Sequence, residues 1–405
     1  MKKLLPYIIA LSILLCGCAP SAVDEIPTEL PSNHDAALSE PTTTDSDLPL
    51  DDDAPIYWQQ PMISVSMPLV TEYTTINDTD IFYYTYQNIY LSVQDQQIAD
   101  SIIINYLNRL DRTRAFSQDL AQQATEAYSD GDTWNPHFLE YVYSPTRIDA
   151  GVLSLYGRNV IYSGGQHAEQ EGISINYNML TGEVLTLGSI LCHADVIDEL
   201  CALTTEALDE LVGTLSLFED YPEVVAQRFT RDPSYDEDWF FTKTGLAFYF
   251  APYEIAPYTS GVVTVEVPYE KLTGIITDEF FPAETDNSEG NVIGTTLSEI
   301  DIDSFTQIAE LELNPDGEQI FLYCDGIVRD VQIETGKWDA NNTNFLVDCT
   351  VLSTATLSPG DGITIRAQIS DTLPTLKLSY YTGSDCVEQF ILYNATDGTV
   401  ILEDS

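Results

Sequence analysis

Histidine and its acidic neighbours are the first place to look for acid–base or metal chemistry in this sequence. The four histidines are His34, His137, His167 and His193. No two of them have the i, i+4 spacing of a helical metal site, and no Gly-x-Ser-x-Gly elbow is present. The cluster of His167 with Glu169 and Glu171 could serve acid–base or metal chemistry, but we favour a loop histidine hydrogen-bonded to the backbone. We therefore predict no catalytic residues.

A different chemistry is predicted at Cys18. Lys2 and Lys3 make a basic start, residues 4–15 are apolar but too short to span a bilayer, and a small residue precedes Cys18. This pattern is typical of a bacterial lipoprotein signal over residues 1–17, after which the Cys18 thiol receives a lipid. We expect an extracytoplasmic protein, anchored to the cell membrane through that lipid alone. An ordinary secretory signal cleaved nearby is the alternative.

The remaining cysteines do not form a metal or redox motif. They are Cys192, Cys201, Cys324, Cys349 and Cys386. None belongs to a Cys-x-x-Cys or Cys-x-x-His pair, so zinc is not expected. The acidic loops at residues 232–238 and 284–289 lack the glycine and terminal glutamate of a calcium loop. We expect no cofactor, buried free thiols at Cys192 and Cys201, and leave open one disulfide among the other three.

The charge of the chain is strongly negative. It has 65 Asp and Glu against 15 Lys and Arg, a formal net charge of −50, and the predicted signal would remove two of the lysines. Such a surface repels nucleic acid and anionic lipid headgroups and attracts cationic proteins. Alternatively, the charge only keeps a surface protein soluble. Clustered Arg109, Arg112 and Arg114 are expected to pair with internal carboxylates, with an anionic ligand as the alternative.

The pattern of the chain predicts several regions, because 405 residues exceed one ordinary core. Residues 18–60 are rich in Pro, Ser, Thr and Asp and predict a disordered acidic stalk. Residues 61–284 mix strands and helices. Strands are predicted at 62–69, 81–93, 138–143, 152–163, 173–180, 183–187, 239–242, 245–250 and 261–267, and helices at 94–128, 195–212 and 222–229. The first strand should be half-buried, the first helix broken near Thr113, and Thr181-Gly182 the turn of a hairpin.

After a polar boundary near residues 285–294, the pattern changes to short strands. Seven such strands lie within residues 291–405, separated by turn signals such as Asp325-Gly326 and Asp397-Gly398. Short strands at this spacing predict an all-β, sandwich-like C-terminal domain.

Two segments carry a resemblance to a known family. Tyr162-Ser163-Gly164-Gly165-Gln166-His167 has paired glycines for a tight loop, and residues 248–261 contain Pro252 and Pro257, which exclude helix. With the hairpin between them, these segments resemble the RsiV-like extracytoplasmic domain family, over about residues 62–281. The family includes the sensor domain of the anti-sigma factor RsiV and the accessory domain of the peptidoglycan deacetylase PdaC. The resemblance implies an α+β domain, an antiparallel sheet with packed helices.

The two segments that carry the resemblance supply our candidate binding loop. The candidate binding loop comprises Tyr162, Gly164, Gly165, His167, Tyr253, Glu254 and Tyr258. This sequence departs from the family after the glycine pair, where Gln166-His167-Ala168 replaces a small residue followed by His-Gly, so loop chemistry is not carried over.

For RsiV the ligand is lysozyme, a cationic hydrolase, and we expect a surface-anchored, non-catalytic binding protein for a cationic extracellular protein such as a lysozyme-like hydrolase. One alternative is a cell-wall module that binds peptidoglycan or another polysaccharide through Trp338, Tyr381 and Tyr393. Another is an unrecognised hydrolase that uses His167.

Overall fold

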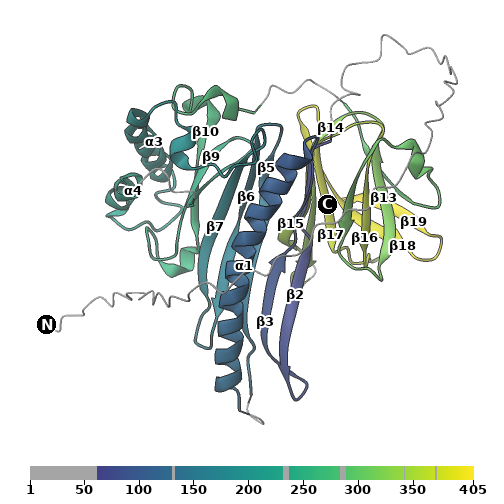
Figure 1. The fold of residues 1–405 in the computed structure, drawn as a ribbon, viewed down its shortest axis with the longest axis horizontal. Helices are drawn as coiled ribbons and strands as arrows, with labels where there is room; N and C mark the ends of the chain where they lie inside the picture. Colours follow the sequence, from purple (N-terminus) through teal and green to yellow (C-terminus); the bar gives the residue numbers. More distant parts are fainter. Residues whose placement is uncertain (1–61, 130–132, 231–236, 283–288, 342, 370–371) are drawn as a thin grey trace, which may run out of the picture. The chain divides into compact units, whose positions relative to one another are not determined.

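The computed structural model describes residues 62–129, 133–230, 237–282, 289–341, 343–369 and 372–405. The predicted signal, the stalk and Cys18 lie outside these residues, so lipid attachment stays a prediction. Among the helices of the described residues, none is both long and apolar enough to cross a membrane. This part of the chain is mainly β and forms four sheets (Figure 1).

The first sheet has five strands. In spatial order they are β2 (Leu69–Ile76), β3 (Thr79–Gln87), β5 (His137–Ile148), β6 (Val152–Tyr162) and β7 (Glu169–Asn178). β3 and β5 run parallel, and the other neighbours are antiparallel. The parallel pair departs from the expected antiparallel sheet because the connection from β3 to β5 includes a long helix, which returns the chain to its starting end.

That helix, α1 (Gln96–Ala127), lies along one face of the first sheet (Figure 1). It begins at Asp95, whose side chain accepts a hydrogen bond from the Gln97 N–H at 2.9 Å. The predicted break near Thr113 is wrong. Thr113 Oγ1 donates to the Arg109 carbonyl oxygen at 3.2 Å, so its hydroxyl is satisfied without interrupting the helix.

The second sheet has three strands and is packed between helices and the first sheet. Its elements are β10 (Val263–Pro268), β9 (Gly245–Phe250) and β8 (Trp239–Phe241), with helices α2 (Leu187–Ile190), α3 (Ile197–Asp209) and α4 (Tyr221–Phe229) and single 3-10 turns at Ala194–Val196, Tyr258–Ser260, Tyr269–Lys271 and Asp278–Phe280. Every residue of β8 and β9 is buried. One face packs in the core that contains α3 and α4, while Phe240 and Tyr249 pack against Tyr156 of β6.

The remaining two sheets face each other across a common core. The four-stranded sheet contains β11 (Val292–Thr296), β13 (Glu318–Cys324), β16 (Asp361–Ala367) and β12 (Gln307–Glu312), and a 3-10 turn lies at Ile302–Ser304. The seven-stranded sheet contains β19 (Thr399–Asp404), β18 (Asp385–Asn394), β17 (Leu376–Thr382), β14 (Val328–Trp338), β15 (Phe345–Leu357), β1 (Ser64–Ser66) and β4 (Tyr90–Ser92). One buried cluster joins Ile365 of β16 to Ile333 of β14, which fits the predicted β-sandwich. All seven predicted strands are present, whereas β11 and β12 were missed.

Strand β1 connects the beginning of the described chain to the C-terminal sheet. Val65 pairs with Ser353 of β15 on one side and with Leu91 of β4 on the other. All three residues of β1 are buried, so the expectation of a half-buried strand is wrong. Strands from both sides of the predicted boundary near residues 285–294 therefore belong to the same sheet: β1 and β4 precede the boundary, and β15 follows it.

The predicted second strand of the hairpin is also absent. After β7, only Val184 pairs with Tyr177, as an isolated bridge. Thr186 then caps α2 through a reciprocal side-chain and backbone bond with Ser189. Because the cap starts a helix at Leu187, the extended segment ends after a single bridge.

Neither of the two cysteines expected to be buried, Cys192 and Cys201, is fully buried. All five within the described residues are free thiols. Cys324 and Cys349 are buried and Cys201 is partly exposed, but Cys192 is exposed, because it precedes α3 and does not belong to its buried stripe.

Candidate functional site

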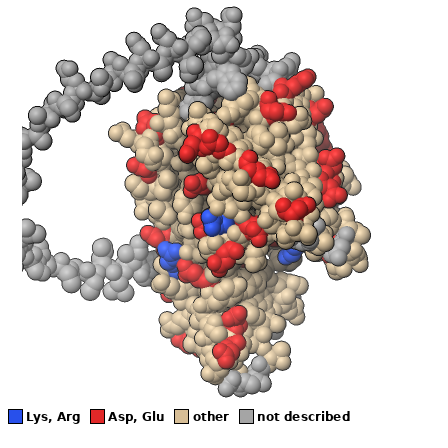
Figure 2. Space-filling model, turned by 90° about the vertical axis from the view of Figure 1, so that its right-hand side faces the viewer, with Lys and Arg blue, Asp and Glu red and all other residues tan. Residues whose placement is uncertain are grey.

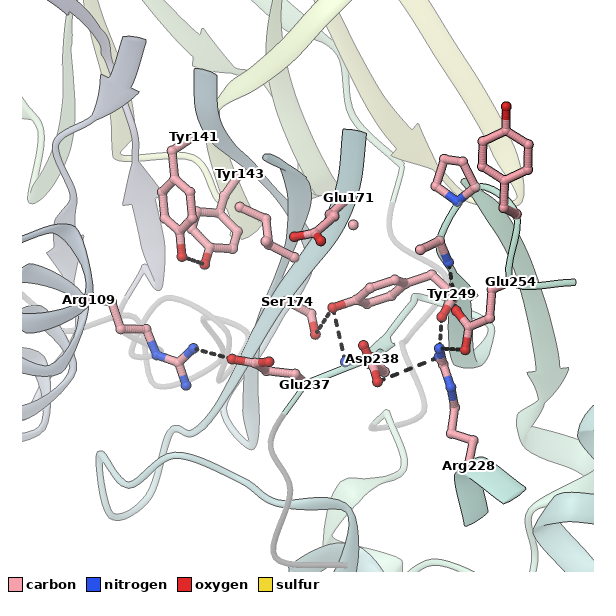
Figure 3. Close-up of a pocket in the computed structure, with 15 residues that line it drawn as sticks. Arg109, Tyr141, Tyr143, Glu171, Ser174, Arg228, Glu237, Asp238, Tyr249 and Glu254 are labelled. Atoms are coloured by element: carbon pink, nitrogen blue, oxygen red, sulfur yellow. Dashed lines mark hydrogen bonds and ion pairs between the residues drawn. The ribbon is translucent and has the colours of Figure 1, made fainter. Parts of the chain in front are cut away.

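A cleft of about 740 Å³ lies at the edge strand of the first sheet, where β7 faces β9 and the loop that follows β9 (Figure 3). Its charged lining residues are Arg109, Glu171, Arg228, Glu237, Asp238 and Glu254. α1 contributes the first of these, β7 the second and α4 the third. The cleft therefore combines four carboxylates with two guanidinium groups.

Arg228 fixes one wall of the cleft. Its Nη2 donates to Glu254 Oε1 at 2.5 Å, its Nη1 donates to the Tyr249 carbonyl oxygen, and its Nη1 lies 3.8 Å from Asp238 Oδ2. The guanidinium carbon also lies 4.4 Å from the centroid of the Phe250 ring. The side chain is only 10% exposed, so these contacts offset part of the cost of desolvating its charge, while Nε has no hydrogen-bond partner among the described residues.

Arg109 pairs with a carboxylate on the opposite side of the cleft. Its Nη1 lies 3.8 Å from Glu237 Oε1. In the same helix, Arg114 Nη2 lies 3.6 Å from Glu72 Oε1. The prediction that this arginine cluster pairs with internal carboxylates is confirmed for these two residues.

Tyrosine phenols supply the neutral polar groups of the lining. The hydroxyls of Tyr141 and Tyr143 lie 2.9 Å apart, and the Tyr249 hydroxyl lies 3.3 Å from Ser174 Oγ and accepts from the Asp238 N–H at 3.0 Å. Burial raises the pKa of Tyr143 and of Tyr249 well above the ordinary value. Both phenols therefore remain neutral.

Glu171 differs from the other three carboxylates. It is exposed on β7 and makes no ion pair or side-chain hydrogen bond with any described residue, whereas Glu237, Asp238 and Glu254 each lie beside an arginine. The cleft thus presents one carboxylate whose charge is not neutralised by any side chain among the described residues. Such a group attracts a cation.

Tyr253 forms the rim of the cleft. It is 68% exposed and has a positive φ of 70°, uncommon for a bulky residue. Its N–H donates to the Ala256 carbonyl oxygen at 3.0 Å, and Glu254 Oε2 accepts from the Ala251 N–H at 2.9 Å. These bonds hold a turn in the segment where the two prolines exclude helix, and Tyr253 belongs to the lining together with the acidic residues.

The structure brings the two predicted loop segments together. The Tyr258 hydroxyl donates to the Ala168 carbonyl oxygen at 2.7 Å, and the rings of His167 and Tyr258 have centroids 5.6 Å apart. The Tyr258 ring is in turn 5.7 Å from that of Tyr253. Of the predicted loop, Tyr253 and Glu254 line the cleft, while His167 and Tyr258 lie next to it.

Tyr162, Gly164 and Gly165 shape the turn after β6 and do not line the cleft. Gly164 has φ +85°, and a Cβ there would lie 2.8 Å from His137 Nε2, so this position requires glycine. The Tyr162 hydroxyl donates to the Gly165 carbonyl oxygen at 3.2 Å, and the Tyr162 ring stacks on Phe138 at 5.6 Å.

The three aromatic residues considered for sugar stacking contact other side chains of the protein. The Trp338 ring packs against Phe390 at a centroid distance of 5.3 Å. Lys243 Nζ lies over the Tyr381 ring at 5.4 Å, and Tyr393 packs partly buried against the sandwich core. All three residues are partly buried.

The chemistry that the cleft can support is recognition of a cation. Within the described ranges, no group of three or more His, Cys, Asp or Glu residues is arranged to hold a metal ion. Glu171 lines the cleft but His167 does not, so the suspected cluster is divided. Carboxylates, phenols and an exposed tyrosine are groups that bind ammonium and guanidinium side chains.

Several lining residues were not predicted. Arg228, Tyr141 and Ser174 reach the cleft from three separate elements, and only tertiary structure brings them together. One available signal was scarcity, because a chain with 15 basic residues places few of them without a carboxylate partner. Arg228, near the end of an amphipathic helix, is therefore a basic residue for which a carboxylate partner is expected.

Comparison with known proteins finds a family model that matches a segment containing part of the cleft. Residues 194–270 match the family described as "Protein of unknown function (DUF3298)", a range that includes α3, α4 and the second sheet. No protein with a curated description matches the chain.

Two solved structures of this family are similar to the chain. One, from Bacteroides fragilis, is 17% identical, covers 54% of this chain and 96% of its own, and has a TM-score of 0.39. The other, from Pseudomonas aeruginosa, is 16% identical, covers 54% of this chain and 97% of its own, and has a TM-score of 0.36.

Proposed function

We propose that this protein is a non-catalytic binding protein that captures a cationic extracellular protein, with a lysozyme-like hydrolase as the specific candidate. The observation that carries the proposal is a cleft lined both by Glu171, whose carboxylate pairs with no described residue, and by the exposed Tyr253. Basic side chains of the partner would form an ion pair with Glu171 and a cation–π contact with Tyr253.

The charge of the whole chain favours the same class of partner. The formal net charge is −50, and Figure 2 shows acidic side chains spread over one face of the molecule with basic side chains in only a few places. Attraction between opposite charges raises association rates by 10- to about 10³-fold and weakens steeply with salt. A cationic protein would therefore be concentrated at this surface before it reaches the cleft.

Resemblance to the RsiV-like family supports the identity of the ligand and the assignment of residues 61–284 as an α+β binding domain. The resemblance rests on the segments that include Gly164-Gly165 and Pro252 to Pro257. With a lipid on Cys18, the protein would be held outside the cell membrane. It would act there by capture or display.

Retention on immobilised lysozyme tests this proposal. Residues 62–405 should be retained at low salt, with weaker but measurable retention at physiological salt, because the bound pair combines screened charge attraction with contacts in the cleft. A neutral protein on the same resin controls for non-specific adsorption. Absence of retention at both salt concentrations would remove the lysozyme assignment.

A further inference from the structure

We propose that the bound partner contributes an extended peptide segment that adds as an antiparallel strand to the open edge of β7 at Gln170 and Gly172. This inference rests on the proposed function and specifies how the partner is held. Main-chain hydrogen bonds would provide a general part of the affinity, and a basic side chain opposite Glu171 would provide the specificity.

The direction of the backbone groups along β7 follows from contacts at its C-terminal end. The Asn178 N–H donates to the Glu183 carbonyl oxygen at 2.9 Å, and the Asn176 carbonyl oxygen accepts from the Leu185 N–H at 2.7 Å. Asn176 and Asn178 therefore direct their backbone groups away from β6. Because the direction alternates along a strand, Gln170 and Gly172 do the same.

The outer edge of β7 is occupied on both sides of these two residues. Residues 183–185 cover Asn176 and Asn178, and the Tyr258 hydroxyl occupies the Ala168 carbonyl oxygen. Between them, the outward backbone groups of Gln170 and Gly172 receive no hydrogen bond from any described residue. The antiparallel bridge between Tyr177 and Val184 shows that this edge of β7 can pair with an antiparallel segment. The backbone at Gln170 and Gly172 is left for a second segment.

The gap opens directly into the cleft. Four consecutive residues of β7, Glu171 to Ser174, line it, and the loop from Ala251 to Glu254 forms the facing wall. At the inner end, Ser174 is 1% exposed, because its hydroxyl contacts Tyr249. An added strand would therefore enter between β7 and the loop and end near Ser174.

The side-chain pattern of the added strand follows from the register. The partner residue opposite Glu171 lies on the same face of the sheet and directs its own N–H away from β7. A lysine or arginine there pairs with the carboxylate. The neighbouring partner residues, opposite Gln170 and Gly172, donate and accept the main-chain hydrogen bonds.

Peptides with blocked termini and alternating lysine and valine provide the probe. With lysine opposite Glu171, the valine N–H groups face β7 and the lysine N–H groups face away. N-methylation of every valine should weaken binding to the full described chain about tenfold or more, since each lost hydrogen bond is worth about 1 kcal/mol. N-methylation of every lysine should leave the affinity within about twofold. Equal effects of the two modifications would overturn strand addition.

A variant of the protein, in place of a modified peptide, tests the same edge of β7. Gln170→Pro removes an outward N–H while keeping the ladder bonds to β6, and edge strands tolerate proline at such positions. We expect severalfold weaker binding of the unmodified peptide, with Gln170→Ala unchanged as the matched control. Far-ultraviolet circular dichroism verifies the fold of both variants, and the methylated peptides remain decisive on the unmodified protein if Gln170→Pro does not fold.

The outcomes separate this inference from the proposed function. If lysozyme is retained but the affinity of the peptide does not respond to valine methylation or to Gln170→Pro, strand addition is wrong and cation capture stands. If neither lysozyme nor the lysine–valine peptide binds, both the proposed function and strand addition are wrong.

Discussion

At the scale of single residues, charged groups of the cleft divide into those that hold its walls and one that remains available. Arg228 is nine-tenths buried and contacts two carboxylates, a carbonyl oxygen and an aromatic ring, so it positions the loop of Tyr253. Glu171 has no such partner among the described residues. A buried, paired charge is costly to disturb, whereas an exposed single carboxylate can meet a ligand at little cost.

His137 makes stability sensitive to pH at the turn of Gly164. It is 6% exposed, its Nδ1 has no hydrogen-bond partner among the described residues, and burial lowers its pKa. The native state therefore disfavours the charged form. As pH falls through the unfolded value of about 6.5, the unfolded chain takes up a proton that the native chain does not, and stability falls.

Thermal unfolding from pH 8 to pH 5 checks this prediction with His137→Gln as the comparison. The unmodified protein should lose more of its midpoint temperature on acidification than the variant, which has no imidazole to charge. An equal loss of midpoint temperature in the two proteins would show that His137 does not cause the pH dependence of stability.

Sequence reasoning found part of the site at this scale for a physical reason. Tyr253 and Glu254 lie in a segment whose prolines and glycine constrain the backbone locally, so their turn is readable from the sequence. Arg228 and Tyr141 meet across the cleft only after distant elements pack, which no local pattern reports.

At the scale of elements, β7 carries the main functional feature because one of its edges is only partly paired. Gly172 lets the Tyr249 ring approach this strand, since a Cβ there would lie 2.4 Å from Tyr249 Cδ2. The ring in turn closes the inner end of the cleft over Ser174. The shape of the site thus depends on a glycine inside a strand.

Gly172→Ala should destabilise the protein by about 1–3 kcal/mol, because the added methyl group forces the buried Tyr249 ring to move. Gly165→Ala is the matched control, since the nearest atom to its Cβ would be 4.0 Å away. Urea unfolding measures both. Equal unfolding midpoints for the two variants would contradict the packing described for β7 and β9.

The elements that the sequence predicted best are those set by local alternation and turns, as in the seven C-terminal strands. The hairpin after β7 was predicted wrongly because Thr186 starts a helix cap where alternation suggested a strand. The break predicted in α1 is absent because Thr113 satisfies its own hydroxyl. In both cases one side-chain hydrogen bond decided the backbone.

At the scale of the whole described chain, β1 makes the C-terminal sheet depend on residues near its N-terminal end. Val65 is fully buried between β15 and β4. Sequence patterns could not reveal this pairing, because its partners are nearly 300 positions apart and alternation reports burial but not the neighbouring strand.

The Val65 side chain packs in the core that contains α1 and β3, so Val65→Ala should weaken the attachment of β1 to β15 by about 1–3 kcal/mol for the lost burial and the cavity in that core. Cys349, which is buried at the face of β15, reports this weakening through its reaction with a thiol reagent. Labelling of Cys349 in moderate urea should be faster in Val65→Ala than in Val347→Ala, where the valine is 44% exposed. The same labelling rate in both would mean that Val65 does not stabilise the pairing of β1 with β15.

The central claim is that the partner's cationic group binds in the cleft and is not merely attracted by net charge. Titration calorimetry with lysozyme at physiological salt separates the two by comparing Glu171→Lys with Glu310→Lys, an equal charge change at an exposed position of β12 outside the cleft. We predict about tenfold or greater loss of affinity for the first variant and less than about threefold for the second, since only the first replaces a direct ion pair by a repulsive contact. Equal losses in the two variants, or no loss in Glu171→Lys, would contradict binding in the cleft.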